Sequence, residues 1–310
     1  MWLNLQIFGF RALWSPYYMA FLIGLALAYF LITGPLRHKF VNGVSKPTRK
    51  QQLFFYSAIA LLYIVKGSPI DLLTHIMLTF HMAQLAIFLL VVPIFFIKGI
   101  PEWIWRKIVK NRLIEPMLNV LTKPLIAILL FNGLFSLYHI PAIFNFSKTA
   151  QVAHTSFAIV LFIASFIVWW PLLNPLNEKD DIHPLLKLAY IAGNGVLFTP
   201  ACVLIIFASH PLFDAYSQNG AWMQALALCV PGDVLGNLQF AISGPEMFSS
   251  MSTMEDQQLG GIIMKIMQEG VYIFLMARIF FGWFTRESLK VDPLPADWSD
   301  ADIQDTKYTI

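Results

Sequence analysis

Charge is scarce in this chain, since Asp, Glu, Lys and Arg make up 13% of its 310 residues while hydrophobic residues make up 57%. Soluble domains carry about 25% charged residues, so a soluble globular domain is excluded and a polytopic membrane protein is expected. The net charge of +3 is too small to indicate nucleic-acid binding. The positions of the charges matter more than their sum.

Two further absences narrow the function. The two cysteines, Cys202 and Cys229, form no CxxC motif, which leaves a thiolate metal site or a redox pair without support. The chain also lacks a GxxxxGKS phosphate loop, an HExxH helix and a GxSxG elbow. The sequence therefore predicts a protein that is not an enzyme.

Long apolar runs dominate what is present. A helix that crosses a bilayer needs about 20 apolar residues, and no stretch alternates with the period of two that a barrel requires. The expected fold is therefore all-α, a bundle of seven transmembrane helices. The runs are Tyr17–Thr33, Gln51–Val65, Leu72–Ile97, Pro124–Ile140, Gln151–Leu173, Leu185–Ala208 and Gly260–Phe284.

The basic residues orient this bundle. Sixteen Lys and Arg residues lie in the connectors on one side and after the last run, whereas Arg11, Lys66 and Lys148 lie on the other side. Cytoplasmic loops carry the excess of Lys and Arg in membrane proteins. The N-terminus is therefore expected outside the cell, and the C-terminus in the cytoplasm.

The chain divides into three parts. Residues 1–14 form a short aromatic segment, either an amphipathic interfacial helix or a frayed end. Residues 15–285 hold the transmembrane domain, and residues 286–310 form a polar cytoplasmic tail. The outer connector, residues 210–258, has no Lys or Arg. Its stretch AWMQALALCV is too short to span, and is expected to lie in the interface or to dip into the protein.

Histidines gather at the outer side of the expected bundle. Five of the seven, namely His75, His81, His139, His154 and His210, fall at or just below the outer face. Any one of them can be an ordinary interfacial histidine, but scattered core histidines would not show this bias. The group therefore predicts a shared metal or cofactor site. The helices that carry His139 and His154 are expected to be antiparallel neighbours, with the two imidazoles at similar depth.

Methionines accompany these histidines. Met77 and His81 are four residues apart, as are Asp71 and His75, and Met82 follows His75 by seven, so each set is expected to share a helical face. Thioether and imidazole together favour copper, especially Cu(I), whereas zinc normally takes cysteine or carboxylate beside histidine. The pattern fits either a relay of metal ligands or one site with supporting residues behind it.

A second methionine set lies in the outer connector. Met247, Met251 and Met254 are spaced as one face of a helix, if that segment is helical. Such a stripe indicates either ordinary packing or a copper-capture face, which the acids Glu255 and Asp256 would help by attracting a cation.

The last apolar run carries charge. Lys265 and Glu269 are four residues apart and are expected to neutralise each other while facing the bundle, or alternatively to mark a proton or ion path. Gly260 and Gly261 allow close helix approach, and Met264 lies just below them.

Several short stretches, in their order, resemble the multi-span CtaG family of bacterial cytochrome c oxidase assembly factors. They are LWSPYY (13–18), HMAQ (81–84) after GSPIDLLTH, YHIP (138–141), His154 with VWWPLL (168–173) behind it, and MEDQQLGGIIM (254–264). Together they cover the chain from about Leu13 to Met267. Many relatives read HMxQH at the second stretch, where this chain has Leu85.

The resemblance implies a multi-pass protein of the bacterial cell membrane that handles copper for the oxidase, a metallochaperone whose partner is the CuB-containing subunit I. By motif, His81, Met82, His139, His154 and Asp256 carry over as functional positions. The predicted copper ligands are then His81, Met82, His139, His154, His75 and Met77. Asp71, Asp256, Met254 and Met264 are expected as supporting positions.

Other functions remain open at this stage. Facing histidines such as His139 and His154 can ligate haem, which would make the protein a membrane cytochrome. A copper or ion transporter would use Lys265, Met267 and Glu269 as a path. A purely scaffolding role would also satisfy the resemblance.

Overall fold

The computed structural model describes residues 5–40, 43–176, 182–238 and 244–291. The described residues are helical or irregular and contain no strand, which confirms the all-α fold. Residues 292–310, most of the expected polar tail, lie outside the described residues.

Five helical stretches are long and apolar enough to cross a membrane: Gln6–Thr33, Leu78–Gly99, Gln151–Leu173, Pro184–Ile206 and Thr253–Ser288. Two bent helix pairs raise this number to seven if each pair counts as one span. They are Arg49–Lys66 with Pro69–Ile76, bent by 44°, and Glu115–Leu121 with Pro124–Tyr138, bent by 82°. Each of the seven expected runs overlaps a helix, but the first bent pair joins the second run, Gln51–Val65, to Pro69–Ile76, which contains the start of the third run.

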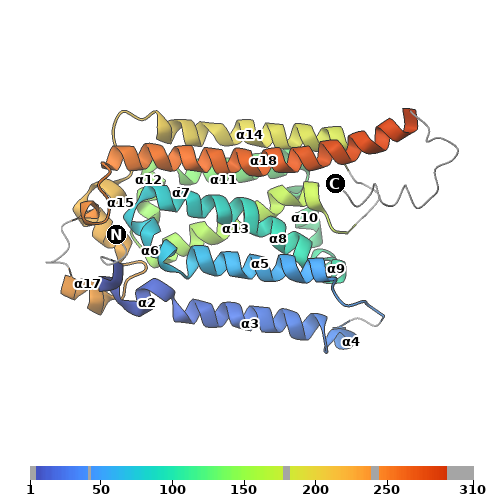
Figure 1. Ribbon diagram of the computed structural model, residues 1–310, viewed down its shortest axis with the longest axis horizontal. Helices are drawn as coiled ribbons and strands as arrows, with labels where there is room; N and C mark the ends of the chain where they lie inside the picture. The colour runs from blue at the N-terminus through green and yellow to red at the C-terminus, as the bar shows by residue number, and fades with distance from the viewer. Residues whose placement is uncertain (1–4, 41–42, 177–181, 239–243, 292–310) are drawn as a thin grey trace.

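The long helices lie side by side along the long axis (Figure 1). The helix α18 (Thr253–Val291) packs along α14 (Pro184–Ile206) and α7 (Leu78–Ala86), while α5 (Arg49–Lys66) packs against α8 (Val92–Gly99) and α3 (Pro16–Thr33). Between these layers, α13 (Gln151–Leu173) contacts α8 and α11 (Pro124–Tyr138). The stretch Leu78–Gly99, which contains α7 and α8, is the most deeply buried of the five long helical stretches.

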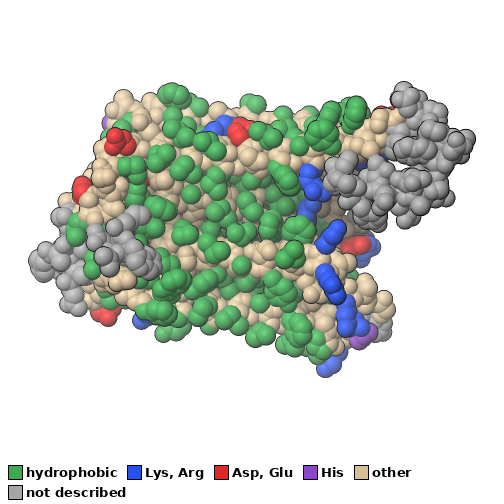
Figure 2. Space-filling view, in the orientation of Figure 1, with side chains coloured by type: hydrophobic (Ala, Val, Ile, Leu, Met, Phe, Trp, Pro, Cys, Tyr) green, Lys and Arg blue, Asp and Glu red, His purple; other side chains and the backbone are tan. Residues whose placement is uncertain are grey.

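The two ends of the bundle differ in charge. Most Lys and Arg side chains on the face shown in Figure 2 gather near one end, beyond a broad apolar belt. This basic end, with Arg37, Arg49, Lys98 and Lys107, holds the short helices α4 (Arg37–Phe40), α9 (Glu102–Val109) and α10 (Glu115–Leu121). Large apolar side chains such as Phe21, Ile163 and Phe274 are more than half exposed on the long helices, as expected of a surface that faces lipid.

The opposite end, which we call the histidine end, is covered by short helices. These are α2 (Gly9–Trp14), α6 (Pro69–Ile76), α12 (Pro141–Ser147), α15 (Asp214–Ser217), α16 (Asn219–Leu226) and α17 (Gly232–Leu238). Leu13 on α2 and Trp222 on α16 are buried in one cluster with Leu72 of α6. The N-terminal segment and the AWMQALALCV stretch therefore both pack onto α6.

The third expected span is not one helix. The helix α6 ends at Ile76, Met77 has an extended backbone with φ −133° and ψ 135°, and α7 begins at Leu78. A π-helical turn, η2 (Ile87–Val91), then joins α7 to α8. The expectation of a continuous helix over Leu72–Ile97 is therefore wrong. Met77 and His81 do not share a helical face, and neither do His75 and Met82.

The break at Met77 is held by Asp256, near the start of α18. Its carboxylate accepts hydrogen bonds from the backbone N–H of Leu78 at 2.6 Å and of Thr79 at 3.1 Å, the first residues of α7. The Thr79 hydroxyl in turn donates to the Asp256 carbonyl at 3.0 Å. A carboxylate at a helix N-terminus satisfies unpaired N–H groups and complements the helix dipole. Asp256 thus replaces the missing preceding turn of helix.

Neighbouring residues fasten α18 on both sides. Gln257 accepts a hydrogen bond from the N–H of Leu212 at 2.7 Å and donates to the carbonyl of Ile205, at the end of α14. Gly260 lies so close to α7 that a Cβ atom would meet the backbone of Leu78 at 3.2 Å. Gly261 approaches α14 more closely still, since a Cβ atom there would meet the side chain of Ile206 at 2.7 Å. The expected close helix approach at this glycine pair is confirmed.

The outer methionines do not form a stripe. Met247 ends the short 3₁₀ helix η3 (Pro245–Met247), Met251 lies in a non-helical segment, and Met254 belongs to α18. Because the segment is not one helix, the expected single face of three methionines is absent.

Asp256→Ala should destabilise the fold by about 2 kcal/mol, because it leaves two buried N–H groups at the start of α7 unpaired. Thermal unfolding in detergent measures this loss. Glu255→Ala is the matched control, since Glu255 is exposed and caps only Ser252. A midpoint for Asp256→Ala as high as that for Glu255→Ala would contradict the capping role.

Candidate functional site

Four of the predicted histidines converge at the histidine end. His75 lies on α6, His81 on α7, His139 directly after α11, and His154 in the second turn of α13. His75, His81 and His139 are at most 2% exposed, and His154 is half-buried. The fifth, His210, is exposed and hydrogen-bonds its neighbour Ser209. The predicted gathering of histidines is thus present without His210.

His75 and His154 form the closest histidine pair described. Their ring centroids are 5.3 Å apart and their planes are inclined by 58°. The Nδ1 atoms of both rings are buried and have no hydrogen-bond partner. Because a metal–nitrogen bond to imidazole is about 2.0 Å long, this spacing allows both rings to reach one ion.

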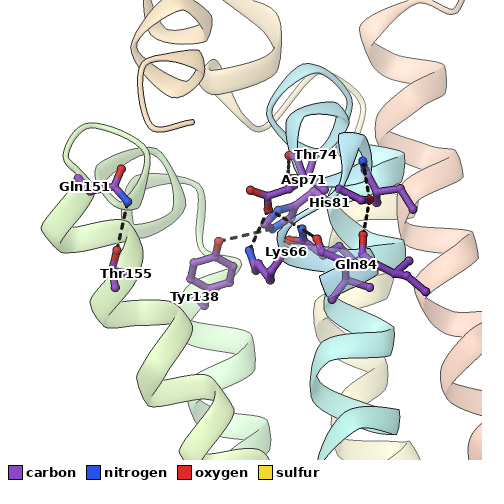
Figure 3. Close-up of polar contacts among 12 residues, drawn as sticks. Lys66, Asp71, Thr74, His81, Gln84, Tyr138, Gln151 and Thr155 are labelled. Carbon is purple, nitrogen blue, oxygen red and sulfur yellow. Dashed lines mark hydrogen bonds and ion pairs between the residues drawn. The ribbon is translucent and has the colours of Figure 1, made fainter. Parts of the chain in front are cut away.

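His81 lies against an aromatic wall. Its Nε2 is 3.4 Å from the hydroxyl of Tyr138 (Figure 3). Its ring meets Phe144 edge-on with centroids 5.3 Å apart, and lies 6.5 Å from Tyr216. The Nδ1 atom of His81 has no hydrogen-bond partner. The ring is therefore held on one side and free to bind on the other.

His139 does not belong to the pair formed by His75 and His154. Its Nδ1 is 2.7 Å from the carbonyl of Phe135, and its ring packs 4.3 Å from the ring of Phe135 and 5.1 Å from that of Tyr138. The helices α11 and α13 are neighbours as expected, but His154 pairs with His75 instead. His139 keeps one unpartnered atom, Nε2.

A polar network supports the site from α5 and α6. Asp71 lies 3.5 Å from the ammonium group of Lys66 and accepts a 2.8 Å hydrogen bond from Gln84 (Figure 3). Gln84 also donates to the carbonyl of Val65. Asp71 was expected to support His75, but its described partners are Lys66 and Gln84. Lys66, Gln84 and Tyr138 were missed as site residues, although the stretches HMAQ and YHIP contain the last two.

A small cavity connects two of the histidines. It has a volume of about 10 Å³ and is lined by His81 and His154 together with the polar groups of Lys66, Gln84 and Tyr138. That volume corresponds to about one water molecule. The cavity therefore has the size for a single water or a single ion, although Leu85, Phe88 and Leu161 make most of its wall apolar.

The predicted methionine ligands lie mainly in packed surroundings. Met82 and Met264 are 1% exposed and belong to the main apolar core. Met77 is 4% exposed and packs in the cluster formed with α2 and α16. Met254 is half-buried near the start of α18. Packing explains Met82 and Met264 without a metal.

A larger cavity of about 260 Å³ lies outside the histidines. Its lining includes Met77 and Met251 and the acids Glu246 and Asp256. Tyr216 also lines this cavity, and its hydroxyl donates a 2.7 Å hydrogen bond to the carbonyl of Thr74. The ring of Tyr216 also lies 6.5 Å from the ring of His81, measured between centroids. Tyr216 therefore separates this outer cavity from the histidines.

Lys148, between α12 and α13, is an unexpected member of the site. It is 2% exposed, and its ammonium nitrogen has no hydrogen-bond partner. That nitrogen lies 5.5 Å from the ring centroid of Phe144 and 5.8 Å from that of Tyr216, the rings that also contact His81. Burial, and then the charge of Lys66, lower the pKa of Lys148 to about 7. The sequence placed this lysine in a loop, where solvent is the ordinary expectation.

Lys148→Met should stabilise the protein at pH 7 and below. The pKa of Lys148 falls from 10.5 to about 7 on folding, so between these values the unfolded chain binds a proton that the folded chain does not. The free energy of unfolding of the wild type therefore rises with pH between about 7 and 10.5, as the destabilising effect of Lys148 disappears. Thermal midpoints of wild type and Lys148→Met should differ by several degrees at pH 6 and converge near pH 10. Midpoints that stay equally separated at all pH values would contradict the buried lysine.

Comparison with known proteins gives one match. A family described as cytochrome c oxidase caa3 assembly factor matches residues 27–286, which include all four clustered histidines and the α18 segment that caps α7. No curated protein matches the chain significantly, and neither does a solved structure. Since the match covers most of the chain, and agrees with the resemblance found in its motifs, the protein belongs to the CtaG family of cytochrome c oxidase caa3 assembly factors.

Proposed function

We propose that this protein binds copper, as Cu(I), at the outer side of the bacterial cell membrane and aids its delivery to the CuB centre in subunit I of cytochrome c oxidase. The observation that carries the proposal is the pair of buried His75 and half-buried His154, whose ring centroids are 5.3 Å apart and whose Nδ1 atoms are buried without a hydrogen-bond partner. Unpaired buried polar atoms are costly unless something binds them. Copper is the cargo in this account, not a resident cofactor.

The ligand set differs from the predicted one. His75 and His154 hold the ion in our proposal, and His81, which lines the same small cavity as His154, is the third ligand or the next position in transfer. His139, turned toward the Phe135 carbonyl, positions Tyr138 and the aromatic wall. Met82 and Met264 pack the core. Within the described residues no three His, Cys, Asp or Glu side chains are grouped as a ready metal site, so the third ligand requires a side-chain movement.

The positive charges near His75 favour a monovalent ion over a divalent one. Lys66, and Lys148 when it is protonated, oppose added positive charge at His75, and Asp71 already partners Lys66. In a low-dielectric interior this repulsion doubles for a divalent ion. Imidazole is a common ligand of copper, and the thioethers of Met77 and Met251 in the neighbouring cavity suit Cu(I). A soft, singly charged ion is therefore the best match to the surroundings.

Access is proposed through the outer cavity. The thioethers of Met77 and Met251 and the carboxylate of Glu246 line its wall, and Tyr216 lies between it and His81. The basic end, on the far side of the apolar belt, is cytoplasmic in this account because cytoplasmic loops carry the excess of Lys and Arg. Copper then enters from the extracytoplasmic side. Haem held by His139 and His154 has no comparable support, since the small cavity at His154 has a volume of about 10 Å³ and is not lined by His139.

Copper per protein after loading with Cu(I) under reducing conditions tests the site. The wild type should retain about one ion, whereas His75→Ala and His154→Ala should each lose most of it, because two ligands are needed to hold the ion. His210→Ala is the matched control, since His210 is exposed at the same end, and should retain copper. A wild type without bound copper would sink the proposal, as would equal losses in His154→Ala and His210→Ala.

Oxidase activity tests delivery. In cells that produce His154→Ala, cytochrome c oxidase activity should fall at least tenfold while the variant remains in the membrane at its normal amount. Copper content of the oxidase should fall in parallel. Full activity with His154→Ala would show that delivery does not use this site.

A further inference from the structure

An ion pair lies on the outward face of α18, in the middle of the apolar belt. Lys265 and Glu269 are joined at 2.6 Å, and their side chains are 27% and 45% exposed. Glu269 lies twelve residues, or about 18 Å, below Gln257 and nine residues, or about 14 Å, above Arg278. The expectation that both side chains face the bundle is therefore wrong for Glu269. Its depth is close to the centre of a bilayer about 30 Å thick.

The two partners differ in how completely they are satisfied. Lys265 donates to the hydroxyl of Thr199 on α14 at 2.9 Å and to the amide oxygen of Gln268 at 2.8 Å, and pairs with Oε1 of Glu269. All three of its hydrogens are used, and it is anchored to the bundle. The other carboxylate oxygen of Glu269 accepts no hydrogen bond within the described residues. Glu269 is thus the half-exposed acceptor of the pair.

Lipid cannot satisfy this acceptor. Acyl chains offer no hydrogen-bond donor, so lipid leaves the second carboxylate oxygen of Glu269 without a partner, although the first is paired with Lys265. The surrounding face is apolar, with Ile266 64%, Ile273 58% and Phe274 61% exposed. Gly270, beside Glu269, is open on this face, with nothing within 4 Å of a Cβ built on it. A small residue at this place lets another helix approach closely.

A second copy of this chain does not supply the donor. In a two-fold pair within the membrane, equivalent residues meet at equal depth, which sets Glu269 opposite Glu269 and Lys265 opposite Lys265. Like charges then face each other, and the Lys265 donors are already used. The complement of this face is therefore a different membrane protein.

We infer that this face of α18, formed by Ile266, Glu269, Gly270, Ile273 and Phe274, docks a transmembrane helix of a cytochrome c oxidase subunit that presents a hydrogen-bond donor at the depth of Glu269. A donor is required on the docked helix because the free carboxylate oxygen of Glu269 is a hydrogen-bond acceptor. The choice of oxidase rests on the family assignment, and the inference is independent of copper binding. The docked helix completes the hydrogen bonding of Glu269 and covers its apolar neighbours.

Photo-crosslinking in membranes tests the docking face. A photoreactive residue placed at Ile273 should give an adduct with an oxidase subunit in cells that produce both proteins. The same residue at Leu129 of α11, which is 53% exposed on another helix, is the matched control and should give at least tenfold less. Equal adducts from both positions, or adducts with a second copy of this chain alone, would overturn the inference.

The double variant Lys265→Met, Glu269→Leu tests the charge itself. Replacing both members of the pair with apolar residues of similar size leaves no unpaired charge and is expected to preserve folding. The adduct from Ile273 should fall about tenfold, while copper per protein stays at the wild-type value. An unchanged adduct would overturn the role of Glu269. The copper-loading experiment tests the histidine site alone, and the crosslinking experiment tests the α18 face alone. The failure of one proposal is therefore distinguishable from the failure of the other.

Discussion

The arrangement of the histidine end depends on one interaction, the capping of α7 by Asp256. An apolar stretch that could form one long helix is divided at Met77, and the N–H groups exposed by the division are accepted by a carboxylate from α18. The division lets α6 turn away, so that His75 faces α13 and His81 faces Tyr138. Without the cap, the two N–H groups would be buried unpaired.

The buried surroundings explain how so many polar groups coexist at this end. Each histidine has different neighbours: His75 hydrogen-bonds the backbone of Ala225 and lies beside the ring of His154, His81 lies near the Tyr138 hydroxyl, and His139 near a backbone carbonyl. Each also keeps an unpartnered ring nitrogen. Lys148 adds a buried amine with no hydrogen-bond acceptor. A site in which several groups lack partners is pre-arranged for something to bind, and the energetic cost of burying them is offset by the packing around it.

Much of this architecture could be predicted from the sequence, because lipid imposes strong rules on length and hydrophobicity. The span Gln151–Leu173 agrees with the helix residue for residue, and the gathering of histidines at one end was correctly expected. The break at Met77 could not be predicted, since its cause lies 179 residues further along the chain at Asp256. The pairing of His75 with His154 depends on that break. Lys148 was missed because loop position normally implies solvent, whereas α12 and α15 cover it here.

The most direct test of the account is X-ray absorption at the copper edge of the Cu(I)-loaded protein. The account predicts two or three nitrogen neighbours at about 2.0 Å, with the outer-shell scattering of imidazole rings, and no sulfur at about 2.3 Å. Sulfur neighbours would place the ion instead on the thioethers of the outer cavity. That result would contradict a centre built on His75 and His154.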